Sequence, residues 1–203
     1  LDGTLTHRLV LEGLFGSVDN VVTTKELMDK KTLANLKIKC VVLKHPPIRE
    51  KMTYAEEIEY LVTNSARNQF IIDLCRNISG NTLCLFQLVE KHGKILHEEI
   101  SSIAKNRKVF FVYGGVDSLE REKIREIVEN EKDAIIIASF GTFSTGINIR
   151  NLHNIVFASP SKSKIRVLQS IGRGLRVTKS KMGVLVFDIA DDISYLSLIH
   201  ISE

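Results

Sequence analysis

The sequence predicts an α/β protein built on a doubly wound, mainly parallel sheet. From about residue 64 onward, short apolar runs rich in β-branched residues alternate with stretches of helical periodicity. Several of these runs, such as 134–138, are apolar at every position, which is typical of strands buried on both faces. A hydrophobic content of 44% over 203 residues is sufficient for a core of this kind.

The elements follow one another in the order that such a sheet requires. We expect strands at 37–44, 82–86, 109–113, 134–138, 154–158 and 183–188. We expect helices at 54–62, 66–77, 90–104, 118–130 and 164–175. The sequence His45-Pro46-Pro47 predicts a turn after the first strand. Asp117 and Glu120 resemble a capping box at the start of the helix 118–130.

Three loops should meet where the parallel strands end, because ligands gather at the carboxyl ends of strands in open sheets. These loops are 87–91, 114–117 and 139–148. The last is rich in hydroxyl side chains and contains two glycines, so its backbone N–H groups and hydroxyls could bind phosphate oxygens. The alternative is a flexible connection in which Ser and Thr cap the neighbouring elements.

The positive charge of the chain is concentrated in one window. Residues 134–187 contain eight Lys or Arg and no Asp or Glu, whereas the rest of the chain contains 20 basic and 24 acidic residues. A local field of this sign suits polyanions such as phosphate chains or a nucleic-acid backbone.

The segment 169–176 is the most informative part of that window. On a helix, four polar side chains would fall within an arc of about 80°. They are Arg166, Gln169, Arg173 and Arg176. Gly172 and Gly174 would each cost about 1 kcal/mol in a helix interior, which indicates close approach by another backbone or a ligand. The alternative is an amphipathic surface helix with a solvated basic face.

Other chemistries have little support in the sequence. Cys40, Cys75 and Cys84 are odd in number and form no Cys-x-x-Cys pair, which argues against a zinc site or a disulfide framework and fits a reducing compartment. The six histidines show no metal-binding spacing, and we expect His92 and His97 to cover a helix surface. No apolar run approaches the ~18 residues of a membrane span, so we expect a soluble intracellular protein without a membrane partner.

The motifs resemble those of the second RecA-like lobe of superfamily 2 helicases. The pattern Gln169-x-x-Gly172-Arg173-x-x-Arg176 resembles the sixth motif of that family, and 144–148 resembles the fifth. Residues 82–87 are similar to the fourth motif, and Tyr113-Gly114-Gly115 with Arg121 is similar to the segment after it. Asn148 stands where many family members carry Asp. Further similarity over about 1–192 points to the phage recombination and fork-remodelling branch of the family.

The resemblance implies a set of site residues. Arg173 and Arg176 would be catalytic arginine fingers on ATP, and the nucleotide-facing positions would be Gln169, Gly146, Asn148 and Gly172. The nucleic-acid-binding positions would be Gln87, Gly114, Thr142, Ser144, Thr145, Lys162, Lys164 and Arg166. For the last three, a solvated basic face is an equal alternative.

The resemblance also implies a domain organisation. Residues 1–16 would be a remnant of the end of the first motor lobe and its linker, 17–192 the C-terminal RecA-like lobe, and 193–203 an unassigned tail. The sequence has no Gly-x-x-x-x-Gly-Lys-[Ser/Thr] loop and no acidic metal-holding motif on a strand. We therefore expect ATP and Mg²⁺ to be held mainly by a missing N-terminal RecA-like lobe of the same polypeptide.

The implied function is that of the C-terminal motor lobe of an ATP-dependent DNA helicase or translocase. It would act on single-stranded or branched DNA in recombination, repair or fork remodelling, in the cytoplasm of a bacterium or a phage-infected host cell, and would be inactive as an ATPase alone. One alternative is a non-catalytic nucleic-acid-binding module derived from a helicase lobe. The other, a small-molecule nucleotide enzyme, is weakened because no glycine fingerprint follows the first strand of the series.

Overall fold

The computed structural model describes residues 5–17, 23–30, 33–46, 52–104, 106–146, 149–160, 171–172 and 183–193. The chain divides into two compact units, Leu1–Leu33 and Ala34–Glu203. The first unit contains helices α1 (Leu5–Phe15) and α2 (Thr24–Asp29). A capping box begins α2, because the Thr23 hydroxyl accepts from the N–H of Glu26 and the Glu26 carboxylate accepts from the N–H of Thr23.

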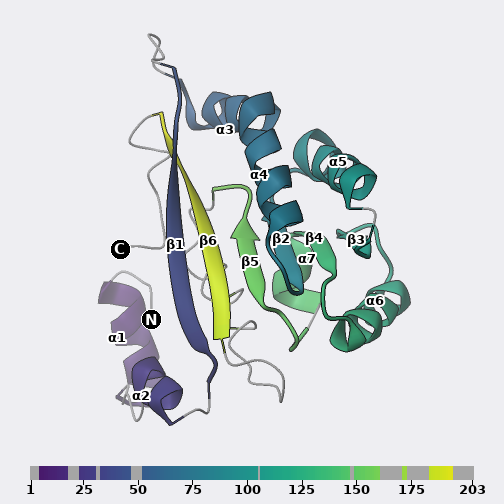
Figure 1. Ribbon diagram of the computed structural model, residues 1–203. Coiled ribbons are helices and arrows are strands. Elements are labelled where there is room, and N and C mark those ends of the chain that lie inside the picture. Colours follow the sequence, from purple (N-terminus) through teal and green to yellow (C-terminus); the bar gives the residue numbers. More distant parts are fainter. Residues whose placement is uncertain are drawn as a thin grey trace. The chain divides into compact units, whose positions relative to one another are not determined.

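The second unit is built on a six-stranded sheet in which every paired strand is parallel (Figure 1). The strands are β1 (Asn35–Lys44), β2 (Thr82–Phe86), β3 (Val109–Val112), β4 (Ile135–Ser139), β5 (Asn154–Phe157) and β6 (Gly183–Asp192). Their order across the sheet is β1-β6-β5-β2-β4-β3. The chain thus runs outward from β2 to β3 and returns through β4, β5 and β6. This confirms the predicted doubly wound parallel sheet.

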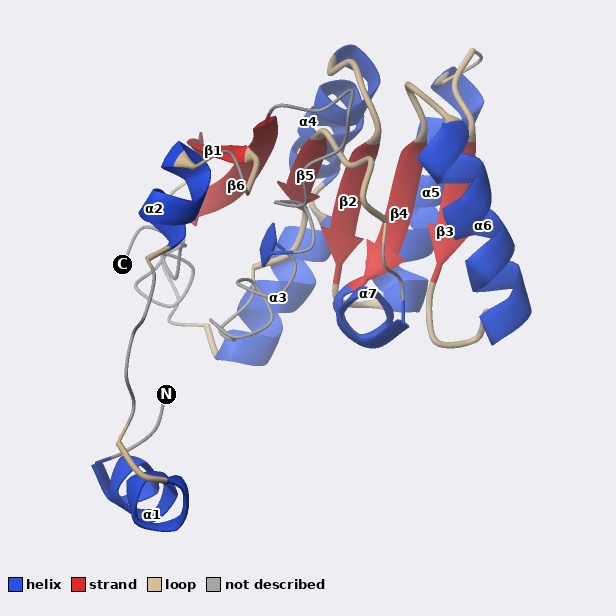
Figure 2. Ribbon diagram, turned by 90° about the horizontal axis from the view of Figure 1, so that it is seen from below, coloured by secondary structure: helices blue, strands red, loops and turns tan. Residues whose placement is uncertain are grey.

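Helices cover both faces of the sheet (Figure 2). The helices of this unit are α3 (Tyr54–Thr63), α4 (Ser65–Asn77), the π-helix η1 (Val89–Gly93), α5 (Lys94–Ile103), α6 (Ser118–Asn130) and α7 (Phe140–Gly146). In Figure 2, α4 and α5 lie behind the sheet, and α6 and α7 lie in front of it. The core between the sheet and the α4–α5 layer contains Ile71, Leu96 and the ring of Phe86, all fully buried.

Two predicted elements differ from the structure. The helix expected at 90–104 begins instead with the π-helix η1, and α5 starts only at Lys94. The loop expected at 139–148 contains α7, since the Ser139 hydroxyl accepts from the N–H of Thr142 at 3.4 Å, as an N-cap does. Phe140 and Phe143 are buried and fix α7 to the sheet. The helix expected at 164–175 lies outside the described residues, except that Ile171 and Gly172 are helical.

Candidate functional site

All six parallel strands end at one side of the sheet, which we call the carboxyl edge. Gln87 directly follows β2, Gly114 follows β3 by one residue, and Thr142 lies in α7 directly after β4. Because β4 pairs with both β2 and β3, the structure brings these three predicted nucleic-acid-binding positions to the same edge.

The turn after β3 contains two adjacent glycines with different surroundings. A Cβ built on Gly115 would lie 2.6 Å from Cε2 of Tyr113, so a larger residue at this position would require the partly exposed Tyr113 ring to move. A Cβ built on Gly114 would meet no atom within 4 Å. Gly114, the predicted DNA-binding position, is exposed, and its surroundings leave room for a ligand to approach the backbone.

In the hydroxyl-rich segment after β4, Ser139 and Thr142 are buried. The Thr142 side chain is only 6% exposed, and its hydroxyl accepts a hydrogen bond from the Ser139 hydroxyl at 2.9 Å. Thr142 therefore supports the start of α7 from inside, and its contact with DNA remains a prediction. Ser144, Thr145 and Gly146 belong to the last turn of α7.

The remaining predicted site residues lie within the basic window, residues 134–187. Arg173, Arg176, Gln169, Asn148, Lys162, Lys164 and Arg166 lie outside the described residues. Gly172 is described: it is helical and exposed, and a Cβ built on it would meet nothing within 4 Å. The close approach predicted for Gly172 is therefore not made by a described part of this chain.

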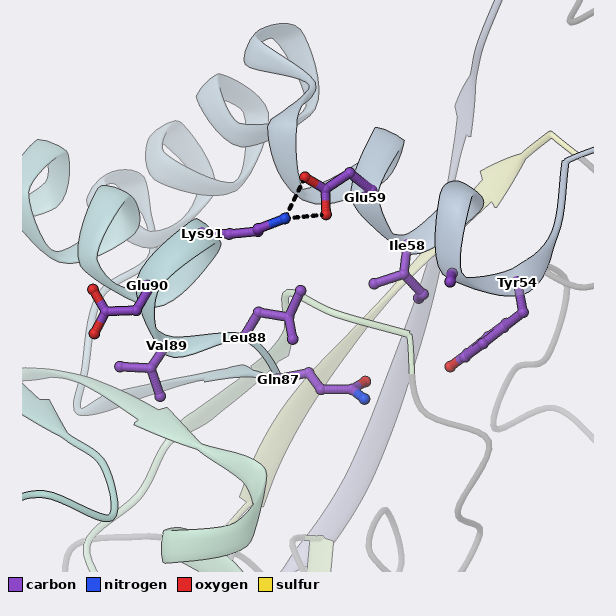
Figure 3. A pocket seen from close by; sticks show the side chains of 9 residues that line it. Tyr54, Ile58, Glu59, Gln87, Leu88, Val89, Glu90 and Lys91 are labelled. Atoms are coloured by element: carbon purple, nitrogen blue, oxygen red, sulfur yellow. Dashed lines mark hydrogen bonds and ion pairs between the residues drawn. The ribbon is translucent and has the colours of Figure 1, made fainter.

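A groove opens beside Gln87 between α3 and η1 (Figure 3). Its volume is about 520 Å³, which is in the range of small-ligand sites. It is lined by Tyr54, Ala55, Ile58, Glu59, Gln87, Leu88, Val89, Glu90 and Lys91. Figure 3 shows the Gln87 side chain extending from the end of β2 toward the side on which Tyr54 lies. Lys91 forms an ion pair with Glu59 across the rim at 2.6 Å.

The π-helix η1, which lines this groove, also carries a buried imidazole, although the sequence predicts a helix-surface position for it. His92, in η1, is fully buried. Its Nδ1 lies 3.0 Å from the Ser159 hydroxyl, and its Nε2 lies 3.2 Å from Oδ1 of Asn68. The Ser159 hydroxyl also accepts a hydrogen bond from the backbone N–H of Gln87 at 3.2 Å. We call this chain of contacts the Asn68–His92–Ser159–Gln87 link.

The partners in this link fix one tautomer of His92. The Asn68 amide donates through Nδ2 to the carbonyl of Val62, so its Oδ1 is an acceptor and Nε2 of His92 carries the proton. Nδ1 then accepts, and the Ser159 hydroxyl donates to it while accepting from Gln87. A neutral imidazole satisfies every contact. Burial, with a smaller contribution from the Arg67 charge, lowers the pKa of His92 to about 3.

A second polar cluster joins the ends of β1 and β6 to α4. Nε of Arg67, in α4, donates to both carboxylate oxygens of Asp191 at 2.9 and 3.0 Å. Nη1 of Arg67 donates to the carbonyl of Ala158, just after β5, at 2.8 Å. Nε2 of His45, just after β1, lies 2.9 Å from the same Asp191 carboxylate. The Arg67 guanidinium and the Asp191 carboxylate are both buried, and their ion pair joins α4 to the end of β6.

The described residues hold no metal-binding cluster. Within these ranges, no three or more His, Cys, Asp or Glu side chains lie close enough together to bind an ion. In the part of the chain that the structure describes, no helix is long and apolar enough to cross a bilayer.

A parallel sheet with helices on both faces and polar loops at its carboxyl edge defines a RecA-like α/β lobe. The helicase conserved C-terminal domain matches residues 66–178, and this chain belongs to that family. The ATP-dependent DNA helicase uvsW of Enterobacteria phage T4 is 39% identical over 187 residues, which are 88% of this chain and 36% of that protein. The chain thus spans about a third of the length of this relative.

Solved structures share the fold of this chain. The crystal structure of T4 UvsW matches with a TM-score of 0.67 and 39% identity over 79% of this chain and 33% of that one. The C-terminal domain of the DEAD-box protein Dbp5 matches with a TM-score of 0.52 over 83% of this chain and 81% of that one. At 13% identity, the second match concerns the fold alone.

Proposed function

We propose that this chain is the C-terminal motor lobe of an ATP-dependent DNA helicase or translocase that acts on branched DNA in recombination, repair or fork remodelling. The observation that carries the proposal is the 39% identity to the phage T4 helicase over 88% of this chain. The parallel sheet supports it, because Gln87, Gly114 and α7 share one edge at which a polyanion could lie.

In this proposal another lobe of the polypeptide holds ATP and Mg²⁺. Arg173 and Arg176 reach the triphosphate from this lobe, where a guanidinium can stabilise the charge that develops on the transferred phosphoryl group. Gln169, Gly172, Gly146 and Asn148 face the nucleotide. Without the other lobe, the chain would not hydrolyse ATP.

The DNA backbone would cross the carboxyl edge. Gln87, Gly114 and the α7 residues Thr142, Ser144 and Thr145 are the proposed contacts, and Lys162, Lys164 and Arg166 extend them. Contacts of this kind bind phosphates and read no base sequence.

The test is the substitution Arg173→Ala in the complete gene product. We expect DNA-stimulated ATP hydrolysis to fall by about 10³- to 10⁵-fold, the usual contribution of an arginine finger, while ATP binding persists. The control is Arg125→Ala, which removes a partly exposed arginine that is paired with Glu122 on α6. Hydrolysis by Arg173→Ala at the wild-type rate would rule out the finger. DNA binding by a wild-type protein without any ATPase activity would favour a non-catalytic nucleic-acid-binding module.

A further inference from the structure

The loop that begins at Gln87 and the chain that leaves β5 are joined by side chains, although 72 residues separate them. Ser159 lies two residues after the end of β5, and Pro160 follows it directly. From residue 161 the sequence leads into the basic segment that contains Arg173 and Arg176. The Ser159 hydroxyl therefore ties the start of that segment to the first residue after β2.

The π-helix η1 is what brings His92 into this junction. A π-turn is wider than an α-turn, and such turns are frequent at functional sites. In η1, the N–H groups of His92 and Gly93 both bond to the carbonyl of Leu88, at 3.2 and 2.9 Å. Gly93 packs against the buried Phe86 ring so closely that a Cβ would lie 2.5 Å from Cε2. The wide turn directs the imidazole of His92 inward rather than along the helix surface.

The chemistry of the link favours a fixed arrangement. Asn68, His92 and Ser159 are all buried, and each contact in the link is between 3.0 and 3.2 Å long. Since the His92 pKa is far below neutral, the imidazole stays neutral in ordinary buffers, and its hydrogen-bond partners keep it in one tautomer. Buried networks that are fully satisfied are rigid, because breaking any one contact leaves a desolvated polar group.

We infer that His92 and Ser159 are positioning residues that couple the Gln87 loop to the segment carrying the two arginines. A displacement of the Gln87 backbone by a bound DNA phosphate is passed through the Ser159 hydroxyl to the chain leaving β5. His92 holds that hydroxyl in the orientation in which it accepts from Gln87. This inference rests on the proposed function and adds a route by which DNA binding affects ATP hydrolysis.

The test compares two buried hydroxyls near opposite ends of strand β2. Ser159→Ala removes the hydroxyl that bonds to Gln87, at the carboxyl edge. Thr82→Val is the matched control: Thr82 begins β2 at the other edge and is fully buried, and its hydroxyl donates to Gly80 and accepts from Asn154. Both variants should lose a similar amount of stability in thermal unfolding.

The decisive measurement is the ratio of DNA-stimulated to DNA-free ATP hydrolysis in the complete gene product. Ser159→Ala should lower this ratio by about 10-fold, the factor that one hydrogen bond typically represents, whereas Thr82→Val should leave it unchanged. His92→Gln should lower it too, and the double variant should be no worse than the more affected single variant, because the two side chains act in one path.

The outcomes separate the two proposals. The coupling would be overturned if the ratio of DNA-stimulated to DNA-free ATP hydrolysis were the same in Ser159→Ala and wild type, or if Ser159→Ala and Thr82→Val lowered this ratio equally. The proposed function would still stand in both cases. A wild-type protein whose ATP hydrolysis is not stimulated by DNA would contradict the proposed function, and the coupling with it.

Discussion

His92 shows how burial changes the chemistry of a single residue. Its spacing from His97 fitted a helix surface, but His92 is fully buried while His97 is half-buried. The His97 ring stacks on Phe111, with ring centroids 4.9 Å apart. One histidine therefore serves in hydrogen bonding and the other in packing, a difference that only their neighbours determine.

The low pKa of His92 predicts a pH dependence of stability. Above the ordinary histidine pKa of 6.5, the imidazole is neutral in both the folded and the unfolded chain. As the pH falls toward about 3, the unfolded chain binds a proton that the folded protein cannot, so stability is lost. At pH 5 the loss through His92 alone should be about 2 kcal/mol of unfolding free energy.

Urea unfolding at pH 7 and pH 5 measures this loss. The His92→Gln variant should be less stable than wild type at pH 7 but should lose less on acidification, since it lacks the titrating group. Exposed carboxylates with lowered pKa values, such as Glu56 and Asp117, titrate in both proteins and cancel in the comparison. The same loss in variant and wild type would show that His92 is not the group responsible.

At the scale of elements, local periodicity did not predict η1 and α7 at the carboxyl edge. The helix α7 directly follows β4, and η1 follows β2 after Gln87 and Leu88; both have buried aromatic contacts. Phe140 of α7 stacks on Phe157 of β5, with ring centroids 5.9 Å apart. Tertiary packing, rather than helix propensity, stabilises such short helices.

The position of η1 predicts a sharp difference between two glycines. Gly93→Ala should destabilise the protein by about 1–3 kcal/mol, because its Cβ would overlap the fully buried Phe86 ring. Gly114→Ala, where a Cβ meets nothing within 4 Å, should change stability by at most about 0.5 kcal/mol. Thermal unfolding of the two variants gives the comparison, and equal stabilities would mean that η1 does not press on Phe86.

At the scale of the whole molecule, charge is the property that links sequence to function. The chain has 28 basic and 24 acidic residues, yet 134–187 contains no acidic side chain. A phosphate backbone bound by this window would release counterions as each lysine or arginine makes contact.

This predicts the salt dependence of DNA binding by the chain. Lys162→Ala and Lys164→Ala should each reduce the slope of log affinity against log salt by about 0.7–0.9, with no change in sequence preference. The control is Lys132→Ala, which removes an exposed lysine just before β4, at the opposite edge of the sheet. Fluorescence anisotropy with two unrelated oligonucleotides measures both quantities. An unaltered slope would remove Lys162 and Lys164 from the DNA path.

The strands could be predicted from the sequence because most of them contain short, nearly continuous apolar runs. All six were found, and β2 and the helix α6 have the predicted bounds. The sequence also predicts that Gln87, Gly114 and Thr142 lie at one edge of the sheet, since parallel strands place the residues that follow them there, and their contact with DNA stays a prediction. The family resemblance was equally available, because it depends on short motifs that survive sequence divergence.

Only the tertiary structure determines which polar side chains are buried and which partners they contact. His92, Asn68 and Ser159 are far apart in sequence, and none has a motif that distinguishes it from a surface residue. Arg67 and Asp191 likewise pair across 124 residues. Hydrophobic periodicity is a local property of the chain, whereas the partner of a buried polar side chain is fixed only when distant strands pair and exclude water.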